Sequence, residues 1–285
     1  MTDTSQPAEW VISDTADVRA VLDDDRFGVR PALAGAPAGT VAWLRASVSR
    51  FSNGPEHGRR RALVVAELDR LDPEGLRAAA CDQARAALEP GGAPGAEAVG
   101  RLARRVPAAV LAARFGAADP DRVASDVGAV AAAYFPGASE DAERAADAAV
   151  RSLLDLLAGS GPDRAVARIT VLVQGYDATA NLVAAALSLL PELPADVPTG
   201  TLLTEAAYRR PPVPALRRVA QAPVRLADRA IAAGDSVVCE VGPVAQPGGA
   251  AAAALTFGYG RRPCPGPAQA LSLAAGVIDA IRTRL

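Results

Sequence analysis

The sequence contains no lysine, so all 30 basic residues among its 285 are arginine. It has one histidine, His57, and three widely separated cysteines with no CxxC pair. Multi-histidine metal sites, zinc sites built from cysteine pairs and a disulfide framework are therefore excluded. The arginines are balanced by 32 acidic residues, giving a net charge of −2, so no broad cationic field would attract nucleic acid.

Long apolar segments are missing as well. No run of about 18 apolar residues is free of charge, and the first ten residues contain neither the basic nor the apolar part of a secretion signal. We therefore expect a cytoplasmic protein that does not bind a membrane. Half of the residues are hydrophobic, which is enough for one large core or two modest ones.

Helical patterns, separated by proline and glycine, cover most of the chain. A strand is predicted at Trp10–Ser13, followed by a helix capped at Asp14 or Thr15. Val224–Leu226 and Ser236–Val238 are predicted to form a hairpin. Further helices are predicted at 55–66, 76–88, 96–115, twice within 123–157, before Arg210 and at 267–284. The sequence thus predicts a mainly α protein with a small β region.

The longest predicted helix spans 163–190 and has a proline on either side. It is apolar nearly all round, so we expect it to be buried. Yet the polar segment Gln174–Asp177 stands near its middle. A glycine there costs about 1 kcal/mol relative to alanine, and a buried acid costs more unless it has a partner. Polar residues at the centre of a buried helix indicate a functional site.

Cys264 stands in a loop of glycine and proline just ahead of a helix, directly after Arg261, Arg262 and a proline. Backbone N–H groups and the helix dipole at such a position favour a thiolate. We therefore interpret the loop as one that presents the Cys264 thiolate as a ligand to a bound group. The alternative is an ordinary buried cysteine. Cys81 and Cys239 are most simply core residues.

Phe257, Gly260, Arg262, Cys264 and Gly266 fill every fixed position of the F-x-x-G-x-[RH]-x-C-x-G haem loop, so the chain resembles the cytochromes P450. The resemblance implies a minimised P450-like fold built around a long central I helix. It implies one haem-binding domain over residues 1–285. It also implies a b-type haem. The Cys264 thiolate would be the proximal ligand that the chain supplies to the haem iron.

The resemblance extends to the segment Gly54–Arg61, which matches the C-helix segment of the family. His57 and Arg61 would pair there with haem propionates, the alternative being a solvated, arginine-rich helix start. Arg59 and Arg60 would face water or a redox partner.

Pro211–Ala220 resembles the segment after the family's K helix, in which Arg218 would meet a propionate. Two carboxylates need several cationic donors, and Arg262 in the haem loop would be another. The residues expected to contact haem from the loop itself are Phe257, Gly258, Arg262, Cys264 and Gly266.

Gln174–Leu182 resembles the oxygen-activating stretch of the I helix. Gly175 would leave room for oxygen, or is a packing glycine. Asp177 would belong to a proton relay, or is a paired acid. The alcohol that usually follows the acid is replaced by Ala178, and Thr179 comes next. These four residues are the candidate catalytic residues.

The chain also departs from the family pattern. It is shorter by roughly a quarter, and little more than the linker Gly242–Ala254 replaces the usual meander before the haem loop. In the K-helix Glu-x-x-Arg pair, Glu205 is in place but Tyr208 stands where arginine is expected. Arg209 is one residue late, about 100° round the helix. The Glu–Arg–Arg lock is therefore expected to be absent or rebuilt.

The resemblance implies oxidation of a small organic molecule, by hydroxylation, oxidative coupling or ring formation, in bacterial specialised metabolism. A ferredoxin-type protein would donate electrons, and a trimmed distal side would suit a bulky, peptide or carrier-bound substrate. Two alternatives stay open. One is haem chemistry without oxygen insertion, such as peroxide use, dehydration or rearrangement. The other is a non-catalytic, P450-like partner of another biosynthetic enzyme. The trimmed surface also leaves a homodimer open.

Overall fold

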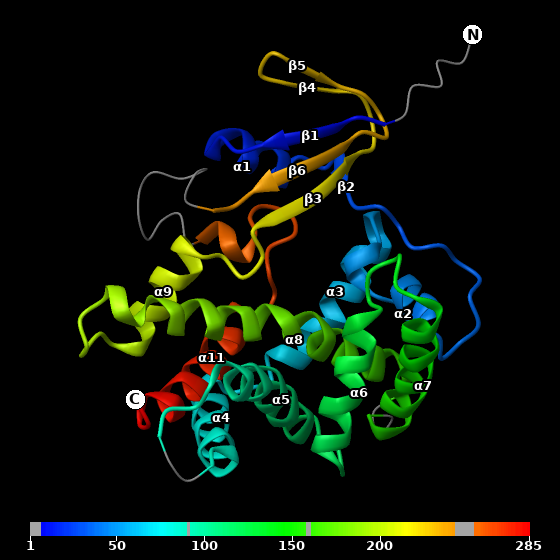
Figure 1. The fold of residues 1–285 in the computed structure, drawn as a ribbon. Helices are drawn as coiled ribbons and strands as arrows, with labels where there is room; N and C mark the ends of the chain where they lie inside the picture. Colours follow the sequence, from blue (N-terminus) through cyan, green and yellow to red (C-terminus); the bar gives the residue numbers. More distant parts are fainter. Residues whose placement is uncertain (1–6, 90–91, 158–160, 243–253) are drawn as a thin grey trace. The chain divides into compact units, whose positions relative to one another are not determined.

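The computed structural model describes residues 7–89, 92–157, 161–242 and 254–285 (Figure 1). Its contacts divide the chain into two compact units. The sheet unit comprises residues 1–30 and 204–264, and the helical unit comprises residues 31–203 and 265–285. Most of the predicted linker at 242–254 lies outside the described residues. The expectation of a single domain stays a prediction.

The sheet unit is built on a four-stranded sheet with the order β1-β6-β3-β2. The central strand β6 (Ser236–Glu240) pairs in parallel with β1 (Glu9–Ile12) and antiparallel with β3 (Ala215–Ala220). The short β2 (Phe27–Gly28) completes the sheet beside β3. The predicted first strand is therefore confirmed.

Helix α1 (Thr15–Asp23) follows β1 and begins at Asp14, whose carboxylate accepts hydrogen bonds from two backbone N–H groups. Its apolar face consists of Val18, Val21 and Leu22, which are all buried. They join the hydrophobic core of the sheet unit, which also contains Ile12, Phe27, Ile231, Val237 and Cys239.

The predicted hairpin partner of Val224–Leu226 is wrong. This strand, β4, pairs instead with β5 (Arg229–Ile231) across a two-residue turn in which Ala227 has a φ of 51°. Ser236–Val238 is not available, because β6 has β1 on one side and β3 on the other. The prediction therefore passed over the nearer segment Arg229–Ile231.

The helical unit confirms the predicted helices within one to three residues at nearly every end. These helices are α3 (Gly54–Leu68), α4 (Pro73–Ala87), α5 (Ala96–Arg114), α6 (Pro120–Ala132), α7 (Glu140–Leu156), α8 (Pro162–Leu189) and α11 (Pro267–Arg282). Helix α9 (Thr199–Arg209) crosses the division between the units. The sequence analysis missed α2 (Val41–Ser47), which begins where the Thr40 hydroxyl accepts a hydrogen bond from the Trp43 N–H. The short η1 (Ser49–Phe51) follows α2, and η2 (Leu190–Glu192) follows α8.

The 28-residue α8 runs through the helical unit and packs against α3, α5, α6, α7 and α11 (Figure 1). Ile169, Leu172, Leu182 and Val183 are buried in these contacts. The expectation of burial all round is wrong for one stripe, since every third or fourth residue from Gln174 to Ser188 is exposed. Among the described helices, none is both long and apolar enough to cross a membrane.

Candidate functional site

The cysteine loop of the sheet unit leaves η4 (Ala254–Phe257) and folds back on itself. The N–H of Cys264 donates a 2.5 Å hydrogen bond to the Phe257 carbonyl. Gly258 and Gly260 have φ angles of +79° and +62°, in the region that favours glycine. A Cβ on Gly260 would lie 2.7 Å from the Cα of Asp23. Backbone geometry and close approach, rather than side-chain packing, therefore fix this loop.

The three cysteines differ in exposure. Cys264 is exposed, whereas Cys239 is fully buried, which confirms its predicted place in the core. Burial raises the pKa of the Cys239 thiol to about 11. Cys81 is only partly buried, so its expected place in the core is wrong in part, and burial raises its pKa as well. The exposed thiol is therefore the one in the glycine-rich loop.

Arg218 lies on β3 and is only 6% exposed. Its Nη1 donates to the Arg217 carbonyl at 2.9 Å, while its Nε is buried and forms no hydrogen bond with the described residues. Burying a guanidinium N–H without an acceptor is costly, so this atom is suited to an anionic acceptor. Arg262, in the cysteine loop of the same unit, is partly buried.

In the helical unit, His57 and Arg61 lie one turn apart near the start of α3, and both are partly buried. The expectation that Arg60 faces water is wrong, because it bonds the Val48 carbonyl and Glu56 at 3.2 and 2.6 Å. Arg59 is exposed, as expected, but also pairs with Glu56, and this hydrogen bond is the main reason that the pKa of Glu56 falls to about 2.

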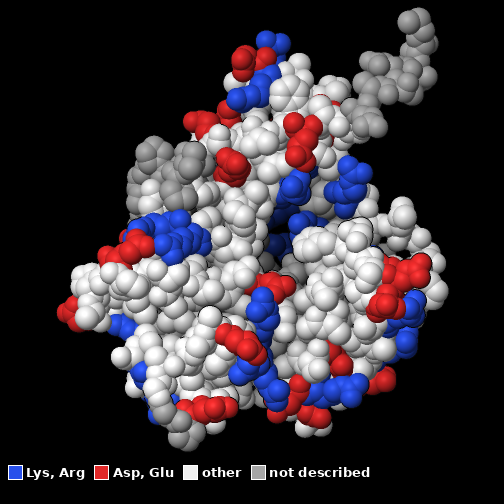
Figure 2. All heavy atoms as spheres, in the orientation of Figure 1, with Lys and Arg blue, Asp and Glu red and all other residues white. Residues whose placement is uncertain are grey.

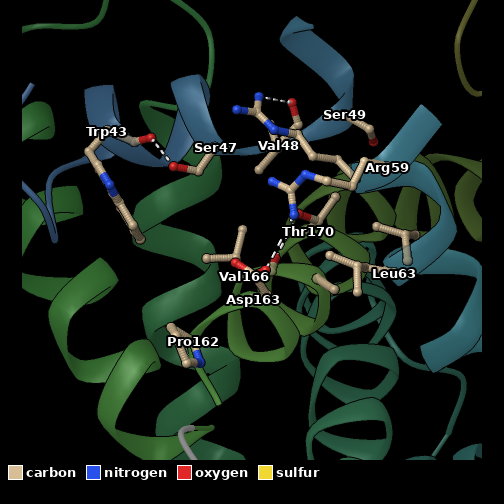
Figure 3. Close-up of a pocket in the computed structure, with 13 residues that line it drawn as sticks. Trp43, Ser47, Val48, Ser49, Arg59, Leu63, Pro162, Asp163, Val166 and Thr170 are labelled. Carbon is tan, nitrogen blue, oxygen red and sulfur yellow. Dashed lines mark hydrogen bonds and ion pairs between the residues drawn. The ribbon is translucent and has the colours of Figure 1, made fainter. Parts of the chain in front are cut away.

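Arg59 and Arg60 line a cavity of about 130 Å³ between the α2–η1 segment, α3 and the start of α8 (Figure 3). Trp43 and Leu63 form part of its wall, and Arg59 reaches across to Asp163 at 3.3 Å. Both arginines already have acidic partners, and the volume is below that of an ordinary organic-ligand pocket. The cavity is therefore not a candidate substrate site.

Gly175 on α8 has open space around its α carbon. A Cβ there would meet only the Thr179 hydroxyl oxygen, at 3.9 Å, among the described residues. Gly276 on α11 is a packing glycine by contrast, since its Cβ would lie 2.3 Å from the Arg77 carbonyl oxygen. Packing within the protein therefore does not explain the glycine at 175. Thr179 is buried and Ala178 is partly buried.

Asp177 forms an ion pair with Arg104 on α5, with 3.1 Å between the Arg104 Nε and a carboxylate oxygen. Both side chains are about half exposed. Of the two interpretations of this acid, the structure contains the paired one. Such an exposed pair is worth at most about 1 kcal/mol, and the carboxylate remains accessible to water.

The altered K-helix pair, Glu205 and Tyr208, lies on α9. Glu205 lies on α9, partly buried, and forms no ion pair with any described residue. Tyr208, which replaces the expected arginine, is also partly buried. Glu205 therefore has no arginine partner among the described residues, and the expectation that the Glu–Arg–Arg lock is absent or rebuilt stays a prediction.

The sequence analysis missed an aromatic and cationic cluster in the helical unit. Phe51, Tyr134 and Phe135 bring three rings together, and Arg50 lies over two of them. Gln174 on α8 donates to the Tyr134 hydroxyl at 3.2 Å. Only the polar residue at 174 was a signal for this cluster. On the face seen in Figure 2, acidic residues and arginines alternate over the helical unit, with no broad surface of one sign.

No protein-family model and no curated protein sequence matches the chain. Solved structures do. CalO2 matches with a TM-score of 0.75 and 23% identity, over 96% of this chain and 82% of that one. P450BioI, in complex with acyl carrier protein ligated to hexadec-9Z-enoic acid, matches with a TM-score of 0.73 and 18% identity, over 95% and 83%. The versatile cytochrome P450 CYP109B1 from Bacillus subtilis matches with 0.72 and 18%, over 96% and 85%.

These similarities show that the chain has the cytochrome P450 fold, mainly α with a small β region around one long helix. The expected haem residues are divided between the units. The sheet unit holds Arg218, Phe257, Gly258, Arg262 and Cys264, and the helical unit holds His57, Arg61, Gly175 and Gly266. In the sheet unit, an exposed thiol and a buried guanidinium nitrogen without an acceptor among the described residues have the chemistry that a haem with carboxylates requires. In the helical unit, the space at Gly175 is not filled by the protein.

Proposed function

We propose that the protein is a haem-thiolate oxidoreductase that acts on a small organic molecule. The observation that carries the proposal is the exposed Cys264 thiol at the end of a loop fixed by two positive-φ glycines and a backbone hydrogen bond. Cysteine is otherwise among the most buried residue types. A bound haem would supply the activation of oxygen or peroxide and the electron transfer for oxidising the substrate.

The chain's own residues would bind the haem by charge and coordination. The Cys264 thiolate would hold the iron. Arg218 and Arg262 from one unit, and His57 and Arg61 from the other, would donate hydrogen bonds to the two carboxylates. The buried Nε of Arg218 supports this assignment, because a propionate oxygen would satisfy it.

On α8, Gly175 would keep space free beside the reacting atoms, and Asp177 would exchange protons with water. Ala178 has no hydroxyl, so the nearest protein alcohol is that of Thr179. Its hydroxyl oxygen lies 3.9 Å from where a Cβ on Gly175 would be, on the same side of the helix. Thr179, with water or a hydroxyl of the substrate, would therefore supply the protons that the reaction consumes.

The first test is the absorption spectrum of the purified protein, oxidised and then reduced under carbon monoxide. We expect the red-shifted Soret band of a thiolate-ligated haem, and we expect Cys264→Ser to abolish it. Cys81→Ser, on a helix of the other unit, is the matched control and should keep the band. Colourless protein that takes up no haem on reconstitution would overturn the proposal in favour of the non-catalytic partner.

A second candidate function, peroxide-driven or redox-neutral haem chemistry, is favoured by one pair of observations. The alcohol after the acid is missing at Ala178, and the acid, Asp177, is already paired with Arg104. Turnover with peroxide, or without any oxidant, in the absence of a reductase would support this candidate. Turnover only with oxygen and a reductase would exclude it.

The finer assignments belong to the same proposal. P450BioI was solved with an acyl carrier protein, and a mutant of P450 EryK with erythromycin B. By analogy we propose a small-molecule, peptide or carrier-bound substrate, in bacterial specialised metabolism. Hydroxylation, oxidative coupling and ring formation stay the reaction classes, with a ferredoxin-type electron donor. Cytoplasmic location and a homodimer stay predictions.

A further inference from the structure

Three aromatic side chains of the helical unit form a cluster that is closed on one side and open on the other. Phe51 ends η1, while Tyr134 and Phe135 stand in the turn between α6 and α7. The ring centroids lie 5.3 to 6.1 Å apart, within the range of favourable aromatic contacts. Tyr134 is 4% exposed, but Phe135 is 58% exposed. The cluster therefore has a buried base and presents an apolar ring to solvent.

Arg50 lies over this cluster, with its guanidinium carbon 5.7 Å from the Phe51 ring centre and 5.8 Å from that of Phe135. It is partly buried, and burial lowers its pKa, although an arginine stays charged at any physiological pH. No carboxylate of the described residues forms an ion pair with it. Contacts with aromatic faces stabilise the cation but do not use its N–H donors. These donors are left for another acceptor.

Arg45, five residues earlier, performs the structural role that Arg50 does not. Its guanidinium donates to the carbonyls of Ala133 and Tyr134 and to the Glu143 carboxylate. It therefore holds the α6–α7 turn in place and forms an ion pair with Glu143 of α7. Among the described residues, Arg50 contacts this turn only through the Phe135 ring and pairs with no acid, so its charge is not required by the fold in the way that the charge of Arg45 is.

The cluster is joined to the part of α8 that carries the candidate catalytic residues. The Nε2 of Gln174 donates to the Tyr134 hydroxyl at 3.2 Å, and the next residue is Gly175, with the open space described above. Tyr134 in turn lies against Phe51, ring to ring. Two side chains, Phe51 and Tyr134, thus connect a molecule held at Arg50 to this stretch of α8.

We propose that Arg50, Phe51 and Phe135 bind the carboxylate end of an amphipathic organic acid. The carboxylate accepts two parallel N–H bonds from Arg50, and the apolar body of the acid lies against the exposed Phe135 ring. That this acid is also the substrate of the enzyme rests on the proposed function. Its binding at Arg50 does not.

Isothermal titration calorimetry with the full-length protein as purified tests the site. The probes are 4-phenylbutyrate and dodecanoate, each compared with the neutral alcohol of the same skeleton. At least one acid should bind tenfold or more tightly than its alcohol. Arg50→Gln should reduce this preference to twofold or less, and Arg50→Lys should retain part of it, because lysine keeps the charge but not the fork. Arg101→Gln, a neutral exchange at an exposed arginine of α5, should leave it unchanged.

Each variant is first compared with the parent protein by thermal unfolding, so that a folding defect is not taken for lost binding. No preference of the parent protein for either acid, or an equal preference in Arg50→Gln, overturns the inference. The haem spectrum separates this result from failure of the proposed function. Colourless protein that prefers the acid keeps the site and loses the haem enzyme, whereas haem-loaded protein without the preference does the reverse.

Discussion

Glu67, near the end of α3, is almost completely buried and accepts hydrogen bonds from two arginines of α8. Arg164 donates at 2.6 Å and Arg168 at 2.7 Å, and Arg168 also lies over the Phe115 ring. Burial alone would raise the pKa of Glu67, but the two hydrogen bonds outweigh it, so the net shift is downward. The cluster fixes α3, which carries two of the proposed haem contacts, against α8.

Glu67→Gln should therefore destabilise the protein by about 3 kcal/mol, because it leaves two cations facing a neutral amide in a buried position. Urea unfolding at pH 7 measures the loss. Glu97→Gln breaks the exposed pair with Arg101 on α5 and should cost less than about 0.5 kcal/mol. Equal effects of the two substitutions would show that the buried cluster contributes no more than a surface pair.

The role of a single residue was predictable where it depends only on its neighbours in the sequence. The pattern around Cys264 needs only ten consecutive residues. The surroundings of Arg50 and Glu67 were not predictable. The Phe135 ring that contacts Arg50 and the arginines that pair with Glu67 come from helices and turns far along the chain. The unfilled space at Gly175 also requires coordinates, since a packing glycine gives the same letter in the sequence.

At the scale of elements, α4 and α11 pack unusually closely in the helical unit. An added Cβ on Gly276 would lie 2.3 Å from the Arg77 carbonyl oxygen and 2.8 Å from the Ala80 Cβ. The backbones of the two helices therefore come together at the one residue of α11 that lacks a side chain.

Gly276→Ala should destabilise the protein by about 1–3 kcal/mol, because one helix must move away from the other. Gly58→Ala on α3 is the control. It has nothing within 4 Å of the added Cβ, and alanine is the better helix former, so it should stabilise by up to about 1 kcal/mol. Thermal unfolding of both variants gives the comparison. Stabilisation by both would mean that the α4–α11 contact adjusts without cost.

Helices were predicted well from periodicity and proline positions, since both signals lie within the element itself. Strand pairing was not, because β6 pairs with β1 near the start of the chain as well as with β3 shortly before it. The seven-residue α2 is too short to show a period, and its Thr40 cap was its clearest sign. The exposed stripe of α8 was missed because a helix with an apolar majority can still have one polar face.

For the whole molecule, the absence of lysine has a consequence at high pH. Arginine stays protonated to above pH 12, so the ion pairs do not weaken between pH 7 and 11 for lack of a cation. The stability at high pH is limited instead by buried groups that lose a proton there, a tyrosine hydroxyl and a cysteine thiol. Burial raises the pKa of Tyr134 in the helical unit, and that of Cys239 in the sheet unit from 9.0 to about 11.

Both groups keep their protons in the folded protein at a pH where the unfolded chain has lost them. The unfolded state then binds fewer protons than the folded state, so the free energy of unfolding falls as pH rises. For each group this stability is present below the unfolded pKa and is lost as pH rises through the folded pKa. For Cys239 the loss amounts to about 2 kcal/mol between pH 8 and 10.5.

Cys239→Ala should remove this part of the alkaline decline while leaving the part that Tyr134 causes. The two tryptophans separate the units, since Trp10 lies in the sheet unit, where its indole donates to Asp235, and Trp43 lies in the helical unit. Urea unfolding followed by Trp10 fluorescence in a Trp43→Phe background, at steps from pH 7 to 10.5, gives the slope for the sheet unit alone. The alanine variant starts less stable at pH 7, because it leaves a small cavity, but its free energy of unfolding should then vary less with pH. Parallel slopes with and without the thiol would mean that Cys239 is not protonated differently in the two states, and that another group causes the alkaline limit of the sheet unit.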